Sequence, residues 1–469
     1  MVEISFGVLI MQEIFSQQKE SFQKSPFPSL KVRKQNLKLI LKIISDYKSE
    51  WIEAINDDFG HRSKDETLLM ELMQAQDLIK FVSKNLRKWM RPESRSSGLL
   101  NIPVRSKIYW QPLGVVGIIS PWNYPIDLTL SPLVYAIATG NRVMIKPSEH
   151  TPKTSKLLQT LVSKYFDIEH VAVCCGDINI GIEFSKLPFD HLMFTGSTNT
   201  GKLVMAEAAK NLTPVTLELG GKSPTIIGEE AEISSAARRI CFGKSINSGQ
   251  TCIAPDHIYI PKNKVEEFVN EYKKSFEKMY PQGEKDEGYT CIINNFHFNR
   301  IQNLIKDAKE KGAKVEEVVR WDNKQKIAPH FIFETTEDME VSKTEIFGPL
   351  LPIITYSDIS EPINIINSND KPLALYYFGK NKKIKKKLID ETQSGGVVFN
   401  DTVIQFAIKS LPFGGVGASG MGQYHGKEGF QTFSQAKPVV FKGRINPLRL
   451  AYPPYGKKIH KLLEKFFIK

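Results

Sequence analysis

Short apolar segments alternate with helical patterns over residues 113–225, and this alternation constrains the fold more than any other feature of the chain. Each apolar segment is five or six residues long, which suits a buried strand better than a helix. The expected strands are residues 115–119, 141–146, 171–175, 191–195 and 214–219. Strands that alternate with helices at this spacing form a parallel, doubly wound sheet. Ligands of such a sheet bind at the carboxyl ends of its strands.

The same alternation continues over residues 226–405, which predicts a second domain of the same kind. Its helices are expected near residues 231–246, 263–280 and 296–311. Residues from about 11 to 90 carry apolar side chains at helical spacing and predict long amphipathic helices. The expected fold class is therefore α/β, with two doubly wound, Rossmann-like domains.

The segment between the N-terminal helices and the first strand predicts a small arm. Residues 94–98 are polar and predict a turn, whereas residues 101–112 look extended. Pro103 and Pro112 cannot donate to a sheet ladder, which restricts this extended segment to an edge or an arm.

Composition and charge narrow the class of protein. With 41% hydrophobic and 24% charged residues, the chain of 469 residues is typical of globular proteins. The five cysteines are odd in number and lack metal-ligand spacing, which predicts reduced thiols in a cytoplasm and no metal site. The net charge is +12, but no nucleic-acid-binding motif accompanies it, so we expect no nucleic-acid partner. No run reaches the roughly 18 apolar residues of a membrane span.

Residues 247–252 (Asn-Ser-Gly-Gln-Thr-Cys) place a thiol directly after a turn of small residues and just before an apolar strand. A cysteine on such a turn can face a cleft near unpaired backbone N–H groups, which favour a thiolate and a nearby oxyanion. A cysteine taken alone is more often a small buried hydrophobe. Cys252 is therefore a candidate nucleophile only in combination with other motifs.

Two strand ends in the first half suit a dinucleotide. Residues 196–201 (Gly-Ser-Thr-Asn-Thr-Gly) join a strand to a helix, so their N–H groups and the helix N-terminus could hold a pyrophosphate. This turn is not the G-x-G-x-x-G fingerprint and is weak evidence by itself. Lys146 and Glu149 also follow a strand, and a carboxylate near the adenosine ribose favours an unphosphorylated 2′-hydroxyl. An ordinary strand-ending turn would look the same.

Seven motifs, in this order along the chain, resemble those of the aldehyde dehydrogenase superfamily. They are residues 121–125, 146–149, 195–201, 218–222, 249–252, 345–349 and 411–417. The short N-terminal region and residues 419–426 are similar to the class-3 branch, which acts on fatty, aromatic and carotenoid-derived aldehydes. The resemblance covers roughly residues 110–430.

The resemblance implies a role for each catalytic candidate. Cys252 would form a thiohemiacetal with the aldehyde, and the Asn123 amide with the Cys252 N–H would hold the oxyanion. Glu218 would activate the water that cleaves the thioester, with Glu345 as a second candidate base. The cofactor would be NAD, with NADP possible, held by Lys146, Glu149, Thr195, Gly196, Ser197, Gly201, Glu345 and Phe347.

Two alternative functions stay open. A CoA-acylating enzyme would use CoA in place of water, although Glu218 favours hydrolysis. A non-catalytic relative would bind without turnover, although it would have no chemical reason to keep Cys252, Glu218 and Asn123. One position departs from the family pattern: relatives often carry a histidine where this chain has Ile408-Lys409, which puts their substrate specificity in doubt.

The resemblance also implies a domain organisation and a homodimer. Residues 1–91 and 114–225 would form the NAD(P)-binding domain, and residues 226–405 the catalytic domain that carries Cys252. Residues 92–113 and 406–440 would bridge two subunits.

Residues 441–469 form a basic tail with eight Lys or Arg residues and one Glu. Ile459, Leu462, Leu463, Phe466 and Phe467 fall on one face of a predicted helix, with lysines mostly elsewhere around it. Such a helix suits peripheral contact with an anionic membrane surface. It could equally dock on the body of the enzyme or on a partner subunit.

Overall fold

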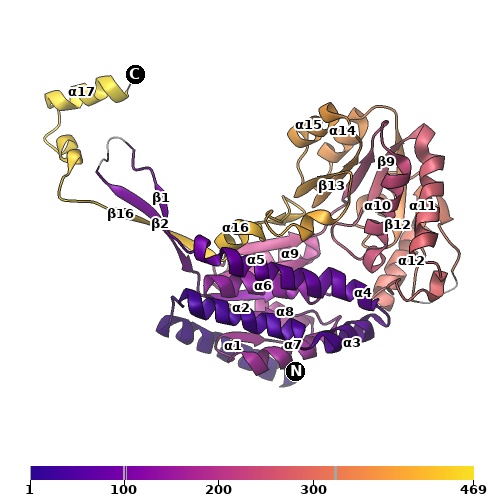
Figure 1. The fold of residues 1–469 in the computed structure, drawn as a ribbon, viewed down its shortest axis with the longest axis horizontal. Coiled ribbons are helices and arrows are strands. Elements are labelled where there is room, and N and C mark those ends of the chain that lie inside the picture. Colours follow the sequence, from indigo (N-terminus) through magenta and orange to yellow (C-terminus); the bar gives the residue numbers. More distant parts are fainter. Residues whose placement is uncertain (1, 99–100, 102, 322–324, 469) are drawn as a thin grey trace.

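The computed structural model describes residues 2–98, 101, 103–321 and 325–468 of the chain. Figure 1 shows two α/β bodies side by side, with an arm that projects from one of them and carries the C-terminus at its far end. Both bodies contain a mainly parallel sheet, which confirms the predicted fold class.

The first sheet has the strand order β15-β7-β6-β3-β4-β5. Its parallel strands are β3 (Val115–Ile119), β4 (Arg142–Lys146), β5 (Val171–Val173), β6 (His191–Gly196) and β7 (Val215–Leu219). All five fall within the predicted segments or within one residue of them. The short edge strand β15 (Gly420–Met421) comes from the distant C-terminal region and pairs antiparallel with β7.

Both faces of this sheet are covered, because successive residues of a buried strand point to opposite sides. Val116 and Ile118 face helices from the N-terminal layer, whereas Val115 faces the opposite layer. The first layer contains α2 (Leu30–Ser45), α3 (Lys48–Phe59), α5 (Met73–Trp89), α6 (Asp127–Thr139) and α7 (Pro152–Tyr165). The opposite layer contains α1 (Val2–Lys24), α8 (Ile178–Ser185) and α9 (Thr198–Ala209). The N-terminal helices thus begin at Val2, before the predicted residue 11.

The second sheet has the order β10-β11-β12-β9-β8-β13-β14. Its strands are β8 (Pro224–Ile227), β9 (His257–Pro261), β10 (Lys314–Glu317), β11 (His330–Phe333), β12 (Leu350–Tyr356), β13 (Ala374–Phe378) and β14 (Gly396–Phe399). Only the edge strand β10 runs antiparallel among the described pairs. One face packs on α10 (Ile233–Ser245) and α11 (Val265–Met279). The other face packs on α12 (Asn295–Glu310), α14 (Ser360–Ser368) and α15 (Lys382–Glu391).

The arm is a three-stranded antiparallel sheet of β1 (Glu93–Arg95), β2 (Arg105–Pro112) and β16 (Ser434–Phe441). The prediction of an extended arm segment is confirmed, but the predicted polar turn at residues 94–98 is wrong where β1 lies. The outer strands β1 and β16 are largely exposed and need no apolar alternation, while the central strand β2 is mostly half-buried. Polar contacts hold β1 in place: the Glu93 carboxylate accepts from Trp110 Nε1 at 3.1 Å and from Lys427 Nζ at 2.6 Å.

The C-terminal helix α17 (Lys458–Phe467) lies beyond the arm and away from both sheets (Figure 1). It contacts the preceding turn through His460 Nε2 and the Leu450 carbonyl at 2.9 Å. The predicted apolar side chains are in large part solvent-exposed, with Phe466 71% and Phe467 55% exposed. Across the described part of the chain, no helix combines the length and apolar character that crossing a membrane would require.

Candidate active site

The candidate residues meet where the carboxyl edge of the first sheet approaches the amino edge of the second. Strand β7 ends at Leu219 and β8 begins at Pro224, so a short link joins the end of one sheet to the start of the other. Asn123 follows β3, and Glu218 lies at the end of β7. Cys252 precedes β9, and Glu345 precedes β12. The topology therefore gathers motifs that lie far apart in the sequence.

Direct hydrogen bonds join the Asn123 loop to the cysteine loop. The Asn123 Nδ2 atom donates to the Gln250 carbonyl at 3.1 Å, two residues before Cys252. The Tyr124 and Thr251 hydroxyls lie 2.9 Å apart. Asn123 and Gln250 are both buried, while Cys252 is half-buried at the edge of the apolar core. The amide proposed as an oxyanion donor is thus held against the loop that carries the thiol.

The cysteine loop has an unusual backbone. Asn247, Ser248 and Gly249 all have positive φ angles, at 48°, 52° and 73°. Two consecutive non-glycine residues in this region are strained, and such strain persists only where surrounding contacts hold it. The buried Gln250 side chain supplies several of these contacts, donating to the carbonyls of Asn247 at 2.9 Å and Cys291 at 3.1 Å.

Burial is the main reason why the pKa of the Cys252 thiol is raised to about 12, and the nearby carboxyl groups of Glu345 and Glu218 contribute in the same direction. The N–H groups of Cys252 and Ile253 lower the pKa, as expected from the sequence, but their effect is outweighed. Desolvation dominates, so the free enzyme carries a protonated thiol at neutral pH.

Glu218 is a buried carboxyl group, 3% exposed, and neither of its oxygens has a hydrogen-bond partner within the described residues. Burial raises its pKa well above the ordinary value. Its strand is fixed from outside by β15, because the Leu219 N–H donates to the Ser419 carbonyl at 3.1 Å. An unpartnered buried carboxyl group in a functional cleft is a candidate proton carrier.

Glu345 approaches the same centre from the second sheet. Burial raises its pKa to about 8, with a smaller contribution from Asp256, while the Gly221 N–H opposes the shift. The Glu345 carboxyl lies against Gly220, where any side chain would collide with it. Gly220, two residues after Glu218 in the sequence, therefore makes room for the second carboxyl group.

A separate pair of contacts fixes the turn that carries Glu345 and Phe347. Arg300 Nη2 donates to the carbonyls of Ile346 at 2.6 Å and Phe347 at 3.1 Å. Asp256 accepts from the Ile346 N–H at 3.0 Å and pairs with Lys222 at 2.5 Å. The Phe347 ring then stands edge-on to Trp122, with centroids 5.4 Å apart.

The predicted ribose-binding pair lies at the end of β4. Lys146 Nζ is 3.0 Å from Glu149 Oε2, and Lys146 is only 2% exposed, whereas Glu149 is exposed. Desolvation raises the pKa of Glu149, but its own backbone N–H and the neighbouring Lys146 outweigh this effect and lower it.

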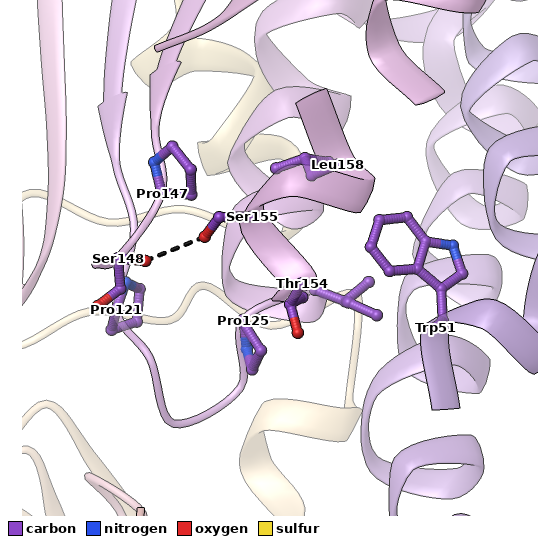
Figure 2. Close-up of a pocket in the computed structure, with 9 residues that line it drawn as sticks. Trp51, Pro121, Pro125, Pro147, Ser148, Thr154, Ser155 and Leu158 are labelled. Carbon is purple, nitrogen blue, oxygen red and sulfur yellow. Dashed lines mark hydrogen bonds between the residues drawn. The ribbon is translucent and has the colours of Figure 1, made fainter. Parts of the chain in front are cut away.

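A small hollow lies between the loop of residues 146–149 and the Asn123 loop. It is lined by Pro121, Pro125, Pro147 and Ser148, among others (Figure 2). The Ser155 hydroxyl donates to the Ser148 carbonyl at 3.0 Å, as Figure 2 shows. This bond ties the ribose loop to helix α7.

The predicted pyrophosphate turn connects β6 to α9. Ser197 caps α9 by accepting from the Thr200 N–H, and the first turn of this helix is largely exposed. A side chain at Gly196 would meet the Phe194 ring, and one at Gly201 would meet Leu219. The glycines thus keep the backbone close to the sheet and leave a helix N-terminus open, which fits an anionic group. Thr195 is the residue at the end of β6 that leads into this turn.

No local sequence signal reveals the supporting role of several residues of the site. Lys222 pairs with Asp256, and Arg300 donates to the Ile346 carbonyl, each tens of residues away in the sequence. A buried cluster around Arg62 likewise reaches the distant Asn123 loop. At the position where the chain departs from the family pattern, Lys409 is buried, with 4% of its surface exposed. Its Nζ lies 5.0 Å from the centre of the Phe406 ring.

The profile of the Aldehyde dehydrogenase family matches residues 11–439, and the chain belongs to this family of oxidoreductases acting on aldehydes. It is 46% identical over 98% of its length to a probable coniferyl aldehyde dehydrogenase of Pseudomonas aeruginosa, covering 96% of that protein. It is 38% identical to the 4,4'-diaponeurosporen-aldehyde dehydrogenase of Staphylococcus aureus, over 98% of this chain and 99% of that one. It is also 41% identical to aldehyde dehydrogenase family 3 member A2 of Mus musculus, over 93% and 90%. These relatives confirm the class-3-like branch.

Solved structures agree with this placement. The substrate-bound state of Staphylococcus aureus AldH superposes with a TM-score of 0.92 at 37% identity, covering 97% of this chain and 99% of that chain. An aldehyde dehydrogenase of Mycobacterium tuberculosis complexed with NAD+ superposes with a TM-score of 0.82 at 25% identity, over 92% and 90%.

Proposed function

We propose that this enzyme oxidises an apolar aldehyde, aromatic or long-chain, to the carboxylic acid through a covalent intermediate on Cys252. The observation that supports this most strongly is the hydrogen-bonded junction of the Asn123 amide with the Cys252 loop. This junction supports the proposal, because covalent attack on a carbonyl requires a nucleophile close to a donor for the oxyanion.

The residues would act in sequence. Cys252 loses its proton to the ionised form of Glu218 or Glu345 and attacks the aldehyde carbon, while the Asn123 amide and the Cys252 N–H stabilise the oxyanion. The carboxyl group releases this proton to solvent before the thioester is cleaved. Bound NAD(P)+ would accept the hydride from that carbon. Glu218 then takes a proton from the water that cleaves the thioester, and Glu345 remains the alternative base.

The dinucleotide would lie along the carboxyl edge of the first sheet. Lys146 and Glu149 would hold the adenosine ribose, and Thr195, Gly196, Ser197 and Gly201 the pyrophosphate region. Glu345 and Phe347 would position the nicotinamide ribose and ring. Glu149 favours NAD over NADP, because a carboxylate beside the ribose opposes a 2′-phosphate. The NAD+ complex of the Mycobacterium tuberculosis relative supports NAD+ as the cofactor.

The names of the relatives and the apolar residues around Cys252 support the class of aldehyde. Two relatives are named for coniferyl aldehyde and for 4,4'-diaponeurosporen-aldehyde. Cys252 lies in the same apolar cluster as Phe406, Phe413 and Tyr424, and rings of this kind suit an aromatic or polyene substrate.

NADH formation from coniferyl aldehyde and from decanal, with and without CoA, tests this function. We expect NADH from both aldehydes without CoA. A requirement for CoA would assign the acylating reaction, and no turnover with either cofactor and either aldehyde would favour a non-catalytic relative.

We further propose the division into domains and a homodimer. Residues 1–91 and 114–225 would bind the dinucleotide and residues 226–405 would carry the nucleophile. Residues 92–113 and 406–440 would bridge two subunits, because the exposed arm offers sheet edges that a partner could cover. Light scattering at micromolar concentration should give twice the chain mass, and a monomer mass would contradict the proposal.

The tail helix is proposed to contact an anionic membrane surface. Its exposed Phe466 and Phe467 and its lysines suit the interface between headgroups and acyl chains. The full chain should float with anionic liposomes at low salt, while a chain ending at Tyr455 should not. Equal, poor flotation of both would favour docking on the enzyme or on a partner subunit.

A further inference from the structure

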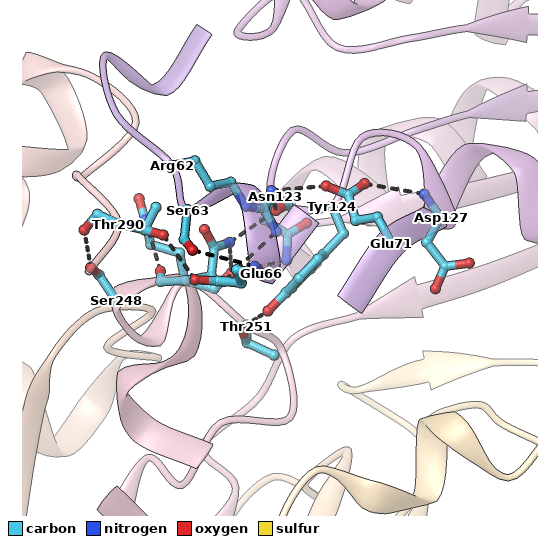
Figure 3. A network of polar contacts seen from close by, with 12 residues as sticks. Arg62, Ser63, Glu66, Glu71, Asn123, Tyr124, Asp127, Ser248, Thr251 and Thr290 are labelled. Atoms are coloured by element: carbon cyan, nitrogen blue, oxygen red, sulfur yellow. Dashed lines mark hydrogen bonds and ion pairs between the residues drawn. The ribbon is translucent and has the colours of Figure 1, made fainter. Parts of the chain in front are cut away.

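A buried charged cluster lies behind the Asn123 loop, and the reaction described above does not use it. Arg62 is 1% exposed and Glu71 is fully buried, with Arg62 Nη1 2.9 Å from Glu71 Oε1. Glu66 Oε1 lies 3.8 Å from Arg62 Nη2. The rings of Phe59 and Tyr124 lie 5.0 and 4.8 Å from the guanidinium carbon. Figure 3 shows the cluster between the N-terminal helices and the two catalytic loops.

The cluster contacts the Asn123 loop at three backbone groups. Arg62 Nη1 donates to the Asn123 carbonyl at 3.1 Å. Glu71 Oε2 accepts from the N–H groups of Ile126 at 2.7 Å and Asp127 at 3.2 Å, at the start of α6. A carboxylate at a helix N-terminus is favoured by the helix dipole. The loop that aims the Asn123 side chain is therefore held at its centre and at its end.

The same cluster contacts the cysteine loop. Asn247 Nδ2 donates to the Asn123 carbonyl at 2.9 Å, so that this oxygen receives one donor from Arg62 and one from the cysteine loop. Glu66 accepts from the Thr290 hydroxyl at 2.9 Å and from the Asn247 N–H. Ser248 in turn donates to the Thr290 carbonyl. The strained residues Asn247 and Ser248 are thus held from the Arg62 side.

A local helix irregularity brings both carboxyl groups toward Arg62. Glu66 and Glu71 are five residues apart, and in a regular α-helix that spacing rotates side chains apart by about 140°. Here residues Leu68–Leu72 form a π-helical turn, which is wider and reduces that rotation. Such turns are rare and occur frequently at functional sites.

Burying these charged groups costs free energy, which suggests that the cluster serves a role other than stabilising the fold. One guanidinium faces two buried carboxyl groups, and burial raises the pKa of Glu71 to about 7. Buried ion pairs contribute little net stability compared with apolar packing, whereas removing one member leaves an uncompensated charge. The cluster can fill this role by fixing the geometry of the Asn123 loop and the cysteine loop.

We propose that Arg62, held by Glu71 and Glu66, is a positioning residue that sets the Asn123 amide against the Cys252 loop. This inference rests on the proposed function, in which Asn123 holds the oxyanion. Arg62 touches neither substrate nor thiol and acts through the Asn123 carbonyl. A displacement of about 1 Å in such a support can lower turnover about 100-fold.

A double-mutant cycle tests the proposal on the full-length enzyme. Arg62→Lys keeps the charge but loses the planar guanidinium whose Nη1 contacts both the Asn123 carbonyl and Glu71, so kcat for aldehyde oxidation should fall by about 10- to 100-fold. In the Asn123→Ala background the same change should lower kcat by less than about threefold, because the group it positions is gone. The KM for NAD should stay unchanged in both backgrounds.

Arg33→Lys is the matched control. Arg33 is also a buried arginine that donates to backbone carbonyls, those of Pro28 at 2.9 Å and Ala138 at 3.1 Å, at the far end of α6. It should lower the melting temperature without lowering kcat. Glu71→Gln provides a second variant of nearly the same shape, and it should repeat the non-additive loss of kcat.

The outcomes separate the two claims. Suppose that the wild type is active, and that Arg62→Lys and Glu71→Gln either keep kcat or lower it equally in both backgrounds. This result overturns the positioning role alone. Loss of kcat in Arg33→Lys as large as in Arg62→Lys also overturns it, since general loosening would then explain the effect. A wild type that forms no NADH from any aldehyde overturns the proposed function and this inference together.

Discussion

Removal of the Asn123 side chain should damage catalysis far more than folding. The backbone contacts of Asn123 with Arg62 and Asn247 survive in Asn123→Ala, because both use its carbonyl oxygen. The substitution removes the hydrogen bond from the Asn123 side chain to the Gln250 carbonyl, and that oxygen still accepts from Asn247 Nδ2 at 3.1 Å. The free energy of unfolding should therefore fall by only about 1 kcal/mol, the net value of one hydrogen bond.

The loss in the transition state should be larger. Removing one oxyanion donor costs about 3 kcal/mol, which corresponds to a decrease of roughly 100- to 200-fold in the rate of the step that needs the oxyanion. Stopped-flow measurement of NADH absorbance in a single turnover reports this step directly, without interference from product release.

A matched asparagine separates the two effects. Asn141 is buried in the same domain, accepts from the N–H groups of Leu113 at 2.7 Å and Gly114 at 3.0 Å, and lies outside the site. Asn141→Ala should destabilise the fold more than Asn123→Ala, because it leaves two buried donors unpaired, yet it should keep the hydride-transfer rate. A rate in Asn123→Ala within threefold of wild type, about the scatter expected from small packing changes, would refute the oxyanion assignment.

Three further predictions follow from the site. Glu218→Gln should give one stoichiometric burst of NADH and then stall, because the thioester forms but no base activates water; a stall in Glu345→Gln instead would assign the base to Glu345. Since the pKa of Cys252 is raised to about 12, its alkylation by iodoacetamide without cofactor should rise steadily from pH 7 to about pH 9.5, and a plateau below pH 9 would contradict the shift. Gly249→Ala should lower both the melting temperature and kcat, because φ is +73° and a side chain would lie 2.5 Å from the Gly348 carbonyl. Gly312→Ala, with φ of +95° and open space around it, should lower only the melting temperature.

The sheets and the motifs at their ends were predictable from the sequence, for local reasons. Short continuous apolar runs define β3, β4 and β6, and helical periodicity defines α10, α11 and α12. Parallel strands then oblige Asn123, Lys146 and Gly196 to share one edge. These inferences need only the residues of each segment and the geometry of a parallel sheet.

The supports of the site were not predictable, because they depend on contacts between distant segments. Arg62 reaches Asn123 across 61 positions, and Lys222 reaches Asp256 across 34. The π-helical turn at Leu68–Leu72 leaves no mark in the apolar pattern. The loop N–H groups lower the pKa of Cys252 as expected, but desolvation and the carboxyl groups of two other segments outweigh them, and these contributions depend on contacts between distant segments.

The covalent role of Cys252 is the central claim, and peptide mass spectrometry tests it most directly. Enzyme mixed with NAD and coniferyl aldehyde, then quenched in acid within one turnover, should carry the acyl mass on the peptide that contains Cys252. Glu218→Gln should accumulate this adduct, and Cys252→Ala should show neither the adduct nor NADH formation while still binding NAD. NADH formation by Cys252→Ala, or an acyl mass on another cysteine such as the half-buried Cys175, would contradict the account.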